Sequence, residues 1–307
     1  MHSILSKLKL ELVTQKGARP PAAVEIAPEG VLAAALPAKG KQPIYAYQPL
    51  PVGALVPGIG EPNLRDPEAI TKAIRSVLGQ ISPRTRAITL ILPDTSVRVF
   101  LLDFDSLPSK TDEVYSVLRF RLRKMVPFDI EHAGLSYQIQ VETKSEVKVL
   151  VAVIPEPTLQ EYEDCISAAG YEAGSVLPSS LAAMAGINSM EAVLTANLTG
   201  LALTTAIVNG QDLLLYRTLD LPEDPDLRLD EVRRGIAVAA AYYEDKLQAR
   251  PSRLLYSGDG EAGLFASWIA ESELEIVDLA PRPETGAVTA LGDLSFAGVV
   301  GALAEAG

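Results

Sequence analysis

The sequence has very few of the side chains from which disulfides, metal sites and nucleic-acid surfaces are built. Its 307 residues include one cysteine, Cys165, and two histidines, His2 and His132. A single thiol cannot form an internal disulfide, which fits a reducing compartment, and so few His and Cys residues exclude a zinc site built from them. Acidic residues number 39 and basic residues 27, for a formal net charge of -12. Nucleic-acid binding depends on clustered Lys and Arg, so we expect no nucleic-acid partner. Because the sequence has so few His and Cys residues, we also expect no bound metal.

Long apolar runs are also absent. No stretch reaches the roughly 18 apolar residues that a membrane-spanning helix needs. Residues 1–13 lack the apolar region and the small-residue cleavage site of a signal peptide. They predict a strand or helix packed on the first domain, with a short amphipathic helix on a membrane or a partner as the alternative. We therefore expect a cytoplasmic protein.

The sequence does contain one order of elements that occurs twice. In each copy, three short apolar runs separated by turn residues predict a meander of strands, and a helix and a further strand follow. Asn209 and Gly210 between apolar runs predict a tight hairpin in the second copy. In the first copy we expect strands at 22–26, 31–36, 44–47, 87–92 and 171–176, and helices at 66–79, 158–169 and 179–185. In the second copy we expect strands at 193–198, 202–208, 212–218, 253–256 and 274–277, and helices at 229–247, 262–270 and 291–304.

The first copy carries extra material between its fourth strand and its second helix. The pattern predicts a strand at 97–104, a helix at 109–125 capped by Ser109, and strands at 133–141 and 147–154. Strand, helix, strand and strand in this order form a small α/β subdomain inserted into the first copy.

A duplicated unit of this order resembles the superfold that actin, Hsp70 and the sugar kinases share. The expected fold class is therefore α/β, an actin-like (ribonuclease H-like) duplicated fold whose two lobes face each other across a cleft. The first lobe would span 1–190, with the inserted subdomain at about 95–155, and the second lobe would span 191–307 in a short form.

Three short motifs in and beside the insertion resemble the type IV pilus assembly protein M (PilM) family. They are LPDTSVRV at 92–99, Leu107 with Pro108 before the helix, and KMVPFDIE at 124–131. The resemblance implies a scaffold or adaptor that is peripheral to the inner membrane and binds the cytoplasmic N-terminal tail of a single-pass pilus-assembly protein. It places the tail in a groove beside the insertion, formed by Arg119, Phe120, Arg123, Pro127 and Phe128. The alternative for these residues is a solvated basic helix face with Phe128 as a packing plug.

The same resemblance implies a nucleotide site with three loops, and the first two depart from the expected pattern. Actin-like ATPases place an acidic residue and then glycine at the end of a strand. Glu25 and Gly30 are present in the first loop, but Pro28 between them has no N–H to donate. In the second loop Asn197 precedes Gly200 where a carboxylate is expected, and an amide is a poorer magnesium ligand.

The third loop keeps its pattern, with Ser257, Gly258 and Gly260 between a strand and a helix. A lone motif of this kind also describes an ordinary tight turn. We therefore expect a pseudo-ATPase with no catalytic residue and no cofactor, and weak binding of ATP and magnesium stays open. Competing hypotheses are an active actin-like ATPase or sugar-kinase-like phosphotransferase, a cytoplasmic component of a type II secretion platform, and an actin-fold protein of unrelated role. Self-association also stays open.

Overall fold

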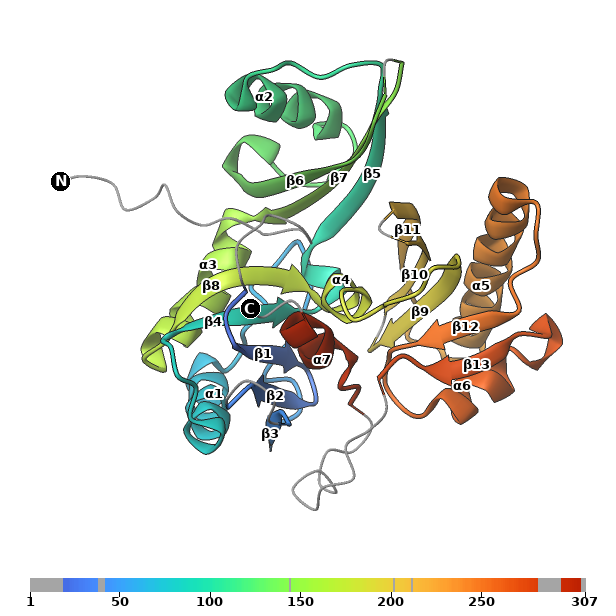
Figure 1. Ribbon diagram of the computed structural model, residues 1–307. Helices are drawn as coiled ribbons and strands as arrows, with labels where there is room; N and C mark the ends of the chain where they lie inside the picture. The colour runs from blue at the N-terminus through green and yellow to red at the C-terminus, as the bar shows by residue number, and fades with distance from the viewer. Residues whose placement is uncertain are drawn as a thin grey trace.

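The computed structural model describes residues 19–37, 42–143, 145–200, 202–210, 212–280 and 294–304. Within these ranges the strands form two five-stranded sheets and one three-stranded sheet, with helices packed on them (Figure 1). No helix among the described residues is long and apolar enough to cross a bilayer. The prediction for residues 1–13 lies outside the described part of the chain.

The first sheet has the strand order β3-β2-β1-β4-β8. β1 pairs antiparallel with β2 and β2 with β3, whereas β4 runs parallel to β1 and β8 parallel to β4. Helix α1 begins where Asp66 accepts a hydrogen bond from the Ala69 N–H at 2.9 Å, and it packs on β2 and β3. The elements are β1 (Ala22–Ala27), β2 (Gly30–Ala35), β3 (Ile44–Pro49), α1 (Pro67–Ile81), β4 (Ala87–Leu92), α3 (Glu156–Ala168), β8 (Glu172–Pro178) and α4 (Ser179–Met184).

The second sheet repeats this order as β11-β10-β9-β12-β13, with the same sequence of antiparallel and parallel pairs. The predicted hairpin is confirmed, because Asn209 pairs with Asp212 and Gly210 has a φ of 62°. The duplication predicted from the sequence is therefore confirmed, and so is the α/β fold class. The elements are β9 (Val193–Thr199), β10 (Ala202–Asn209), β11 (Asp212–Asp220), α5 (Pro225–Leu247), β12 (Arg253–Tyr256), α6 (Ala262–Trp268), η3 (Ala270–Ser272) and β13 (Glu275–Asp278).

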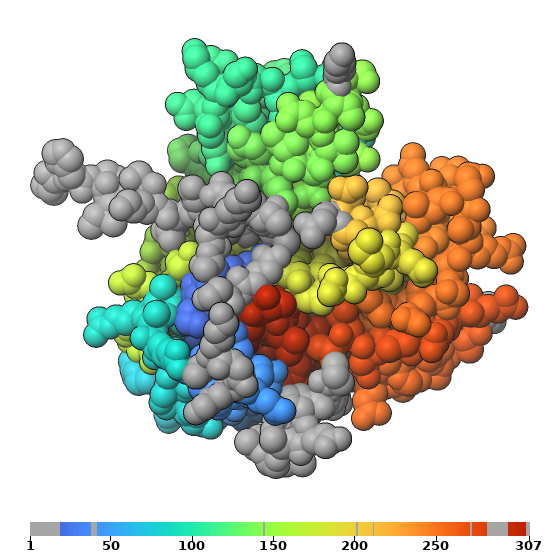
Figure 2. All heavy atoms as spheres, viewed as in Figure 1, coloured from blue at the N-terminus to red at the C-terminus, as the bar shows by residue number. Residues whose placement is uncertain are grey.

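The inserted subdomain projects from the first lobe as a separate body (Figure 2). Its sheet has the order β5-β7-β6, and Val114, Leu118 and Leu122 of α2 pack against it. The predicted start of this helix is wrong by two residues: α2 begins at Thr111, after Lys110, which makes no side-chain cap. The elements are η1 (Asp94–Ser96), β5 (Arg98–Phe104), α2 (Thr111–Leu122), η2 (Ile130–His132), β6 (Ala133–Glu142) and β7 (Val147–Pro155).

The C-terminal helix lies on the first sheet, although the sequence assigned it to the second lobe. Helix α7 (Ala297–Ala304) buries Val299 and Leu303 against β1, β2, β4 and α4. It covers the sheet face opposite α1 and lies between the two lobes (Figures 1 and 2). Gly301 allows α7 to approach α4 closely, because a Cβ at this position would collide with the Ala182 carbonyl oxygen. The predicted lobe boundary at 190 and 191 stays a prediction.

Candidate functional site between the lobes

The cleft between the two lobes contains a cavity of about 280 Å³. Its walls come from the ends of β1 and β9, from η1 and α4, from the 257–259 loop, and from the first residues of α7. Four of the seven residues predicted for the nucleotide site line it, namely Glu25, Asn197, Gly200 and Ser257, whereas Gly30, Gly258 and Gly260 do not. Predicted residues from both copies thus line one common cavity.

Glu25 and Asn197 occupy equivalent positions in the two sheets. Glu25 lies two residues before Ala27, the last β1 residue paired with β2, and Asn197 lies two residues before Thr199, the last β9 residue paired with β10. Both line the cavity. The duplicated pattern in the sequence therefore identified a structurally matched pair.

The Glu25 carboxyl group is buried beneath α7. Its Oε1 accepts a hydrogen bond from the Ser179 hydroxyl at 2.6 Å, and its Oε2 has no hydrogen-bond partner within the described chain. Burial raises the pKa of Glu25 to about 7; the Ser179 hydrogen bond lowers it, and Asp94 and Asp259 raise it further. Gly298 leaves room for this carboxyl, because a Cβ there would collide with it.

Asp94, which follows β4, is the hydrogen-bond centre of the interface between the lobes and was missed in the sequence. It is 2% exposed. Its Oδ1 accepts from the Ser180 N–H and hydroxyl, both at 3.0 Å. Its Oδ2 accepts from the Thr204 hydroxyl at 2.7 Å and lies 3.3 Å from the Asn197 amide, which pairs with the Ser257 carbonyl and the Ser180 N–H when its oxygen and nitrogen are exchanged. Burial raises the pKa of Asp94, while the hydrogen bonds to it act in the opposite direction. With the Ser180 and Thr204 donors bound, the carboxylate has little capacity left for another ligand.

This contact gives Asn197 a structural explanation. A neutral amide at this position can pair with the Ser257 carbonyl and the Ser180 N–H beside the Asp94 carboxylate, whereas an aspartate at position 197 would place two buried carboxylates against each other. The departure from the expected acidic residue therefore matches the position of Asp94. The only sequence signal for Asp94 was its place directly after a buried strand, in the LPDTSVRV motif.

The glycines of the three predicted loops have packing explanations. The Tyr47 ring lies where a Cβ of Gly30 would be, and the Leu198 backbone lies where a Cβ of Gly258 would be. Gly200 and Gly260 have φ values of 51° and 79°, which favour glycine in tight turns. For the third loop, this agrees with the interpretation as an ordinary tight turn.

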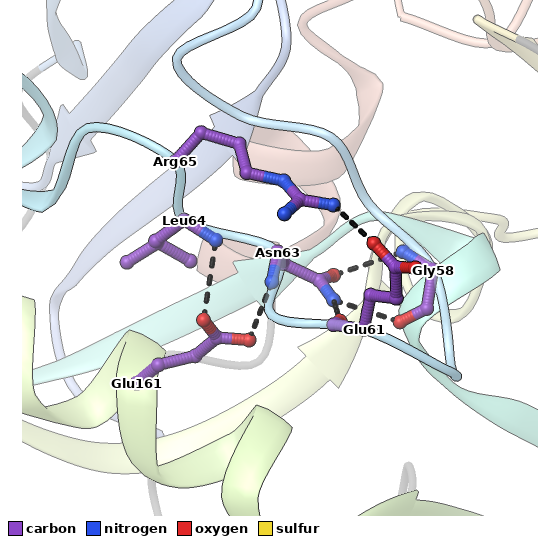
Figure 3. A network of polar contacts seen from close by, with 6 residues as sticks. All are labelled: Gly58, Glu61, Asn63, Leu64, Arg65 and Glu161. Atoms are coloured by element: carbon purple, nitrogen blue, oxygen red, sulfur yellow. Dashed lines mark hydrogen bonds and ion pairs between the residues drawn. The ribbon is translucent and has the colours of Figure 1, made fainter.

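A long loop before α1 closes one side of the cavity through residues 55–57. Asn63, fully buried, folds this loop on itself: its amide donates to the Gly58 carbonyl at 2.8 Å and the Glu61 carbonyl at 3.0 Å (Figure 3). The Gly58 N–H donates back to the Asn63 side chain at 3.0 Å. The loop wall is therefore fixed by its own backbone.

Helix α3 holds the same loop from below. The Glu161 carboxylate accepts from the Asn63 N–H at 2.8 Å and from the Leu64 N–H at 3.1 Å (Figure 3). The Ser96 hydroxyl donates to the Asn63 side chain at 2.6 Å, which ties the loop to η1 as well. The cavity wall and the start of the inserted subdomain are thus parts of one hydrogen-bonded network.

The residues of the cavity do not fit a magnesium triphosphate. The described lining includes the carboxyl groups of Glu25, Glu29 and Asp259 but no Lys or Arg. Across the described ranges, no cluster of three or more His, Cys, Asp or Glu side chains is placed to hold a metal ion. Phosphate binding needs donors or cations, and the Gly200 N–H is already bonded to Asp259 at 2.8 Å.

The residues predicted for partner binding differ in their surroundings. Phe120 is 76% exposed on α2, and Pro127 is exposed. Arg123 is exposed and pairs with Glu131 at 2.7 Å. Arg119 donates to the carbonyl oxygens of Ile130 and Ala133 within the subdomain, and Phe128 packs partly buried on the subdomain core. Only Phe120, Arg123 and Pro127 therefore present their side chains to solvent.

Comparisons with known proteins agree with this architecture. No family model matches the chain, and no curated protein matches it. A solved chain of the "PilM-PilN type IV pilus biogenesis complex" matches with a TM-score of 0.69 at 18% identity, covering 95% of this chain and 100% of that one. The protein has a PilM-like, actin-like fold.

Weaker structural likenesses accompany this match. The cytoplasmic domain of EpsL, from the type II secretion system of Vibrio cholerae, has a TM-score of 0.49 at 12% identity, covering 87% of this chain and 90% of that one. A Bacteroides thetaiotaomicron protein described as having an actin-like ATPase fold has a TM-score of 0.47 at 11% identity, covering 85% and 91%.

Proposed function

We propose that this PilM-like protein is a scaffold of a type IV pilus assembly platform, and that its inserted subdomain binds the cytoplasmic N-terminal tail of a single-pass membrane partner. The observation that carries the proposal is the full-length structural match to a chain of the PilM-PilN complex. The location that follows is the cytoplasm, with attachment to the inner membrane through that partner.

The surface of the inserted subdomain supports a partner site. Phe120 projects from the α2 face opposite the buried Leu118 and Leu122, and 76% exposure is unusual for a phenylalanine. The exposed residues Arg121, in the last turn of α2, and Lys124, in the turn that follows the helix, lie near it in the chain. Aromatic and basic side chains of this kind act as anchors in protein interfaces.

The chemistry of the cleft supports a scaffold without ATPase activity. Phosphoryl transfer needs the charge of the transferring phosphate to be neutralised and the attacking group to be positioned. Here Glu25 has a pKa of about 7 and is covered by α7, while the Ser180 and Thr204 donors already occupy the Asp94 carboxylate. The described cavity residues therefore support a scaffold more than an active phosphotransferase.

The test is binding of a fluorescent peptide with the N-terminal cytoplasmic sequence of the pilus partner, measured by anisotropy. A double variant, Phe120→Ala with Arg123→Glu, removes the exposed anchor and reverses one charge. We expect at least about 10-fold weaker binding, because loss of an interface anchor typically costs more than 1 kcal/mol.

The matched control is Ser116→Ala, an exposed position one turn before Phe120 on the same helix. It should bind as the wild type does, and all three proteins should unfold at similar temperatures. Equal affinity of the double variant and the wild type contradicts the assignment of the surface. A wild type that binds no tail peptide contradicts the proposed function itself.

A further inference from the structure

The turn between β9 and β10 carries a backbone N–H group of the kind that binds anions. Gly200 has a φ of 51°, in the left-handed region, and it lines the cavity between the lobes. A backbone N–H in this conformation can point into a concave site where a phosphate or carboxylate oxygen binds. In this chain the Gly200 N–H donates to the Oδ2 atom of Asp259 at 2.8 Å.

The backbone around Asp259 fixes that carboxylate in place. The Asp259 N–H donates to the Leu198 carbonyl at 2.7 Å, and the Asp259 carbonyl accepts from the Tyr256 hydroxyl at 2.6 Å. Gly258 lets the loop approach the Leu198 backbone, since any Cβ there would collide with it. The 257–260 loop is therefore held against the end of β9 whatever the cavity contains.

Asp259 comes from the loop between β12 and α6, whereas Gly200 directly follows Thr199, the last residue of β9. One side-chain contact thus joins two loops that line the same cavity. A turn N–H of this kind attracts an anion, and here the chain itself provides one.

We propose that Asp259 is a built-in anion of the cleft. Its carboxylate occupies the position at which the oxygen of an external anion would accept from the Gly200 N–H. It holds the β9–β10 turn and the 257–260 loop together without a ligand, and its charge opposes the entry of phosphate groups. The cleft therefore keeps one closed arrangement that does not depend on nucleotide.

The experiment compares thermal unfolding of the wild type and Asp259→Ala with and without inorganic pyrophosphate, at an ionic strength matched with sodium chloride. We expect the wild type to be insensitive to pyrophosphate. We expect Asp259→Ala to unfold at a lower temperature and to recover by about 2 °C or more when pyrophosphate binds the exposed turn.

Asp278→Ala is the matched control, because the Asp278 carboxylate also accepts from a backbone N–H of this lobe, that of Ala262 at 3.3 Å, but does not line the cavity. It should lose stability without responding to pyrophosphate. If Asp259→Ala does not fold, Asp259→Asn removes the charge alone and should respond to pyrophosphate more than the wild type does.

Two results would overturn the proposal. One is an Asp259 variant that responds to pyrophosphate no more than the wild type and Asp278→Ala do. The other is a wild type that pyrophosphate stabilises as strongly as it stabilises the variant. No pilus peptide enters this experiment, so its outcome is independent of the proposed scaffold function.

Discussion

The two lobes share a strand order but use equivalent positions differently. At the end of β1 an acidic residue, Glu25, lies under the C-terminal helix, and one of its carboxyl oxygens has no partner among the described residues. At the end of β9 an amide, Asn197, lies 3.3 Å from Asp94 of the other lobe. The two lobes therefore keep the same backbone arrangement but not the same side-chain chemistry at equivalent positions. Each position has adapted to the element that the tertiary structure places against it.

The largest test of this comparison is Asp94→Ala. The change removes the buried acceptor of the Ser180 N–H and of the Ser180 and Thr204 hydroxyls, which otherwise contact only the Tyr216 and Thr218 hydroxyls among the described partners. We expect the free energy of unfolding to fall by about 4 kcal/mol, since each unsatisfied buried group costs about 1–3 kcal/mol. Urea denaturation measures it.

Asp103→Ala is the control, since its carboxylate is exposed and lies 3.9 Å from Lys148 Nζ. It should change stability by less than about 0.5 kcal/mol. A similar loss in both variants would show that Asp94 does not join the lobes.

The next effect is the pH dependence that Glu25 creates. Because its pKa rises from the usual 4.5 to about 7 in the folded protein, the folded state holds a proton that the unfolded chain has released. Its contribution makes stability fall as pH rises from 4.5 to about 7, by about 3 kcal/mol in total. We expect Glu25→Gln to be more stable than the wild type at pH 8 by up to this amount, and similar to it at low pH.

Urea denaturation across this pH range measures the effect. The groups facing Glu25 are Ser179, Asp94 and Asp259, and the two carboxylates raise its pKa. Glu163, whose pKa burial also raises to about 7, remains in the variant, so part of the fall in stability with rising pH remains as well. Glu163→Gln is therefore the comparison. A Glu25→Gln profile parallel to that of the wild type would show that Glu25 ionises freely beneath α7.

A smaller effect is expected from restoring the acidic residue in the second lobe. Asn197→Asp places a second carboxylate beside Asp94, whose Oδ2 lies 3.3 Å from the Asn197 side-chain amide. We expect a loss of about 2 kcal/mol at pH 8 that shrinks as the pH falls and one carboxyl takes up a proton. Chemical denaturation at two pH values measures it.

Asn188→Asp makes the same chemical change at an exposed position and should cost little. An Asn197→Asp variant as stable as the wild type at pH 8 would mean that the protein accepts a carboxylate at both equivalent positions, 25 and 197. Repulsion from Asp94 would then not explain the amide at position 197.

The smallest effect concerns the exposed link between the second lobe and the inserted subdomain. Arg98 Nη2 lies 3.3 Å from Asp220 Oδ2, and the aspartate is mostly exposed. Asp220→Ala should lower stability by no more than about 0.5 kcal/mol. A double-mutant cycle with Arg98→Ala measures the coupling, and a coupling above about 1 kcal/mol would place the lobe contact here instead of at Asp94.

The sequence predicted the fold because the apolar runs repeat at short range and the strand order follows from that repetition. It also found Glu25, Asn197, Gly200 and Ser257, since equivalent strand ends in a duplicated fold meet at one cavity. It missed Asp94 and Asp259, whose roles depend on contacts with residues 110 and 59 positions away. It placed Arg119 on a partner surface, where the structure has it bonded to carbonyl groups of its own subdomain.

By itself the sequence determined the two matched sheets, the insertion within the first copy and the loss of one acidic residue, because patterning and composition act locally along the chain. Only the tertiary structure decided that α7 returns to the first sheet, that Glu25 lies beneath it, and that Asp94 and Asp259 take up the neighbouring donors. The physical reason is that burial and hydrogen-bond partners set the charge state of a carboxyl group, and both come from segments distant in sequence.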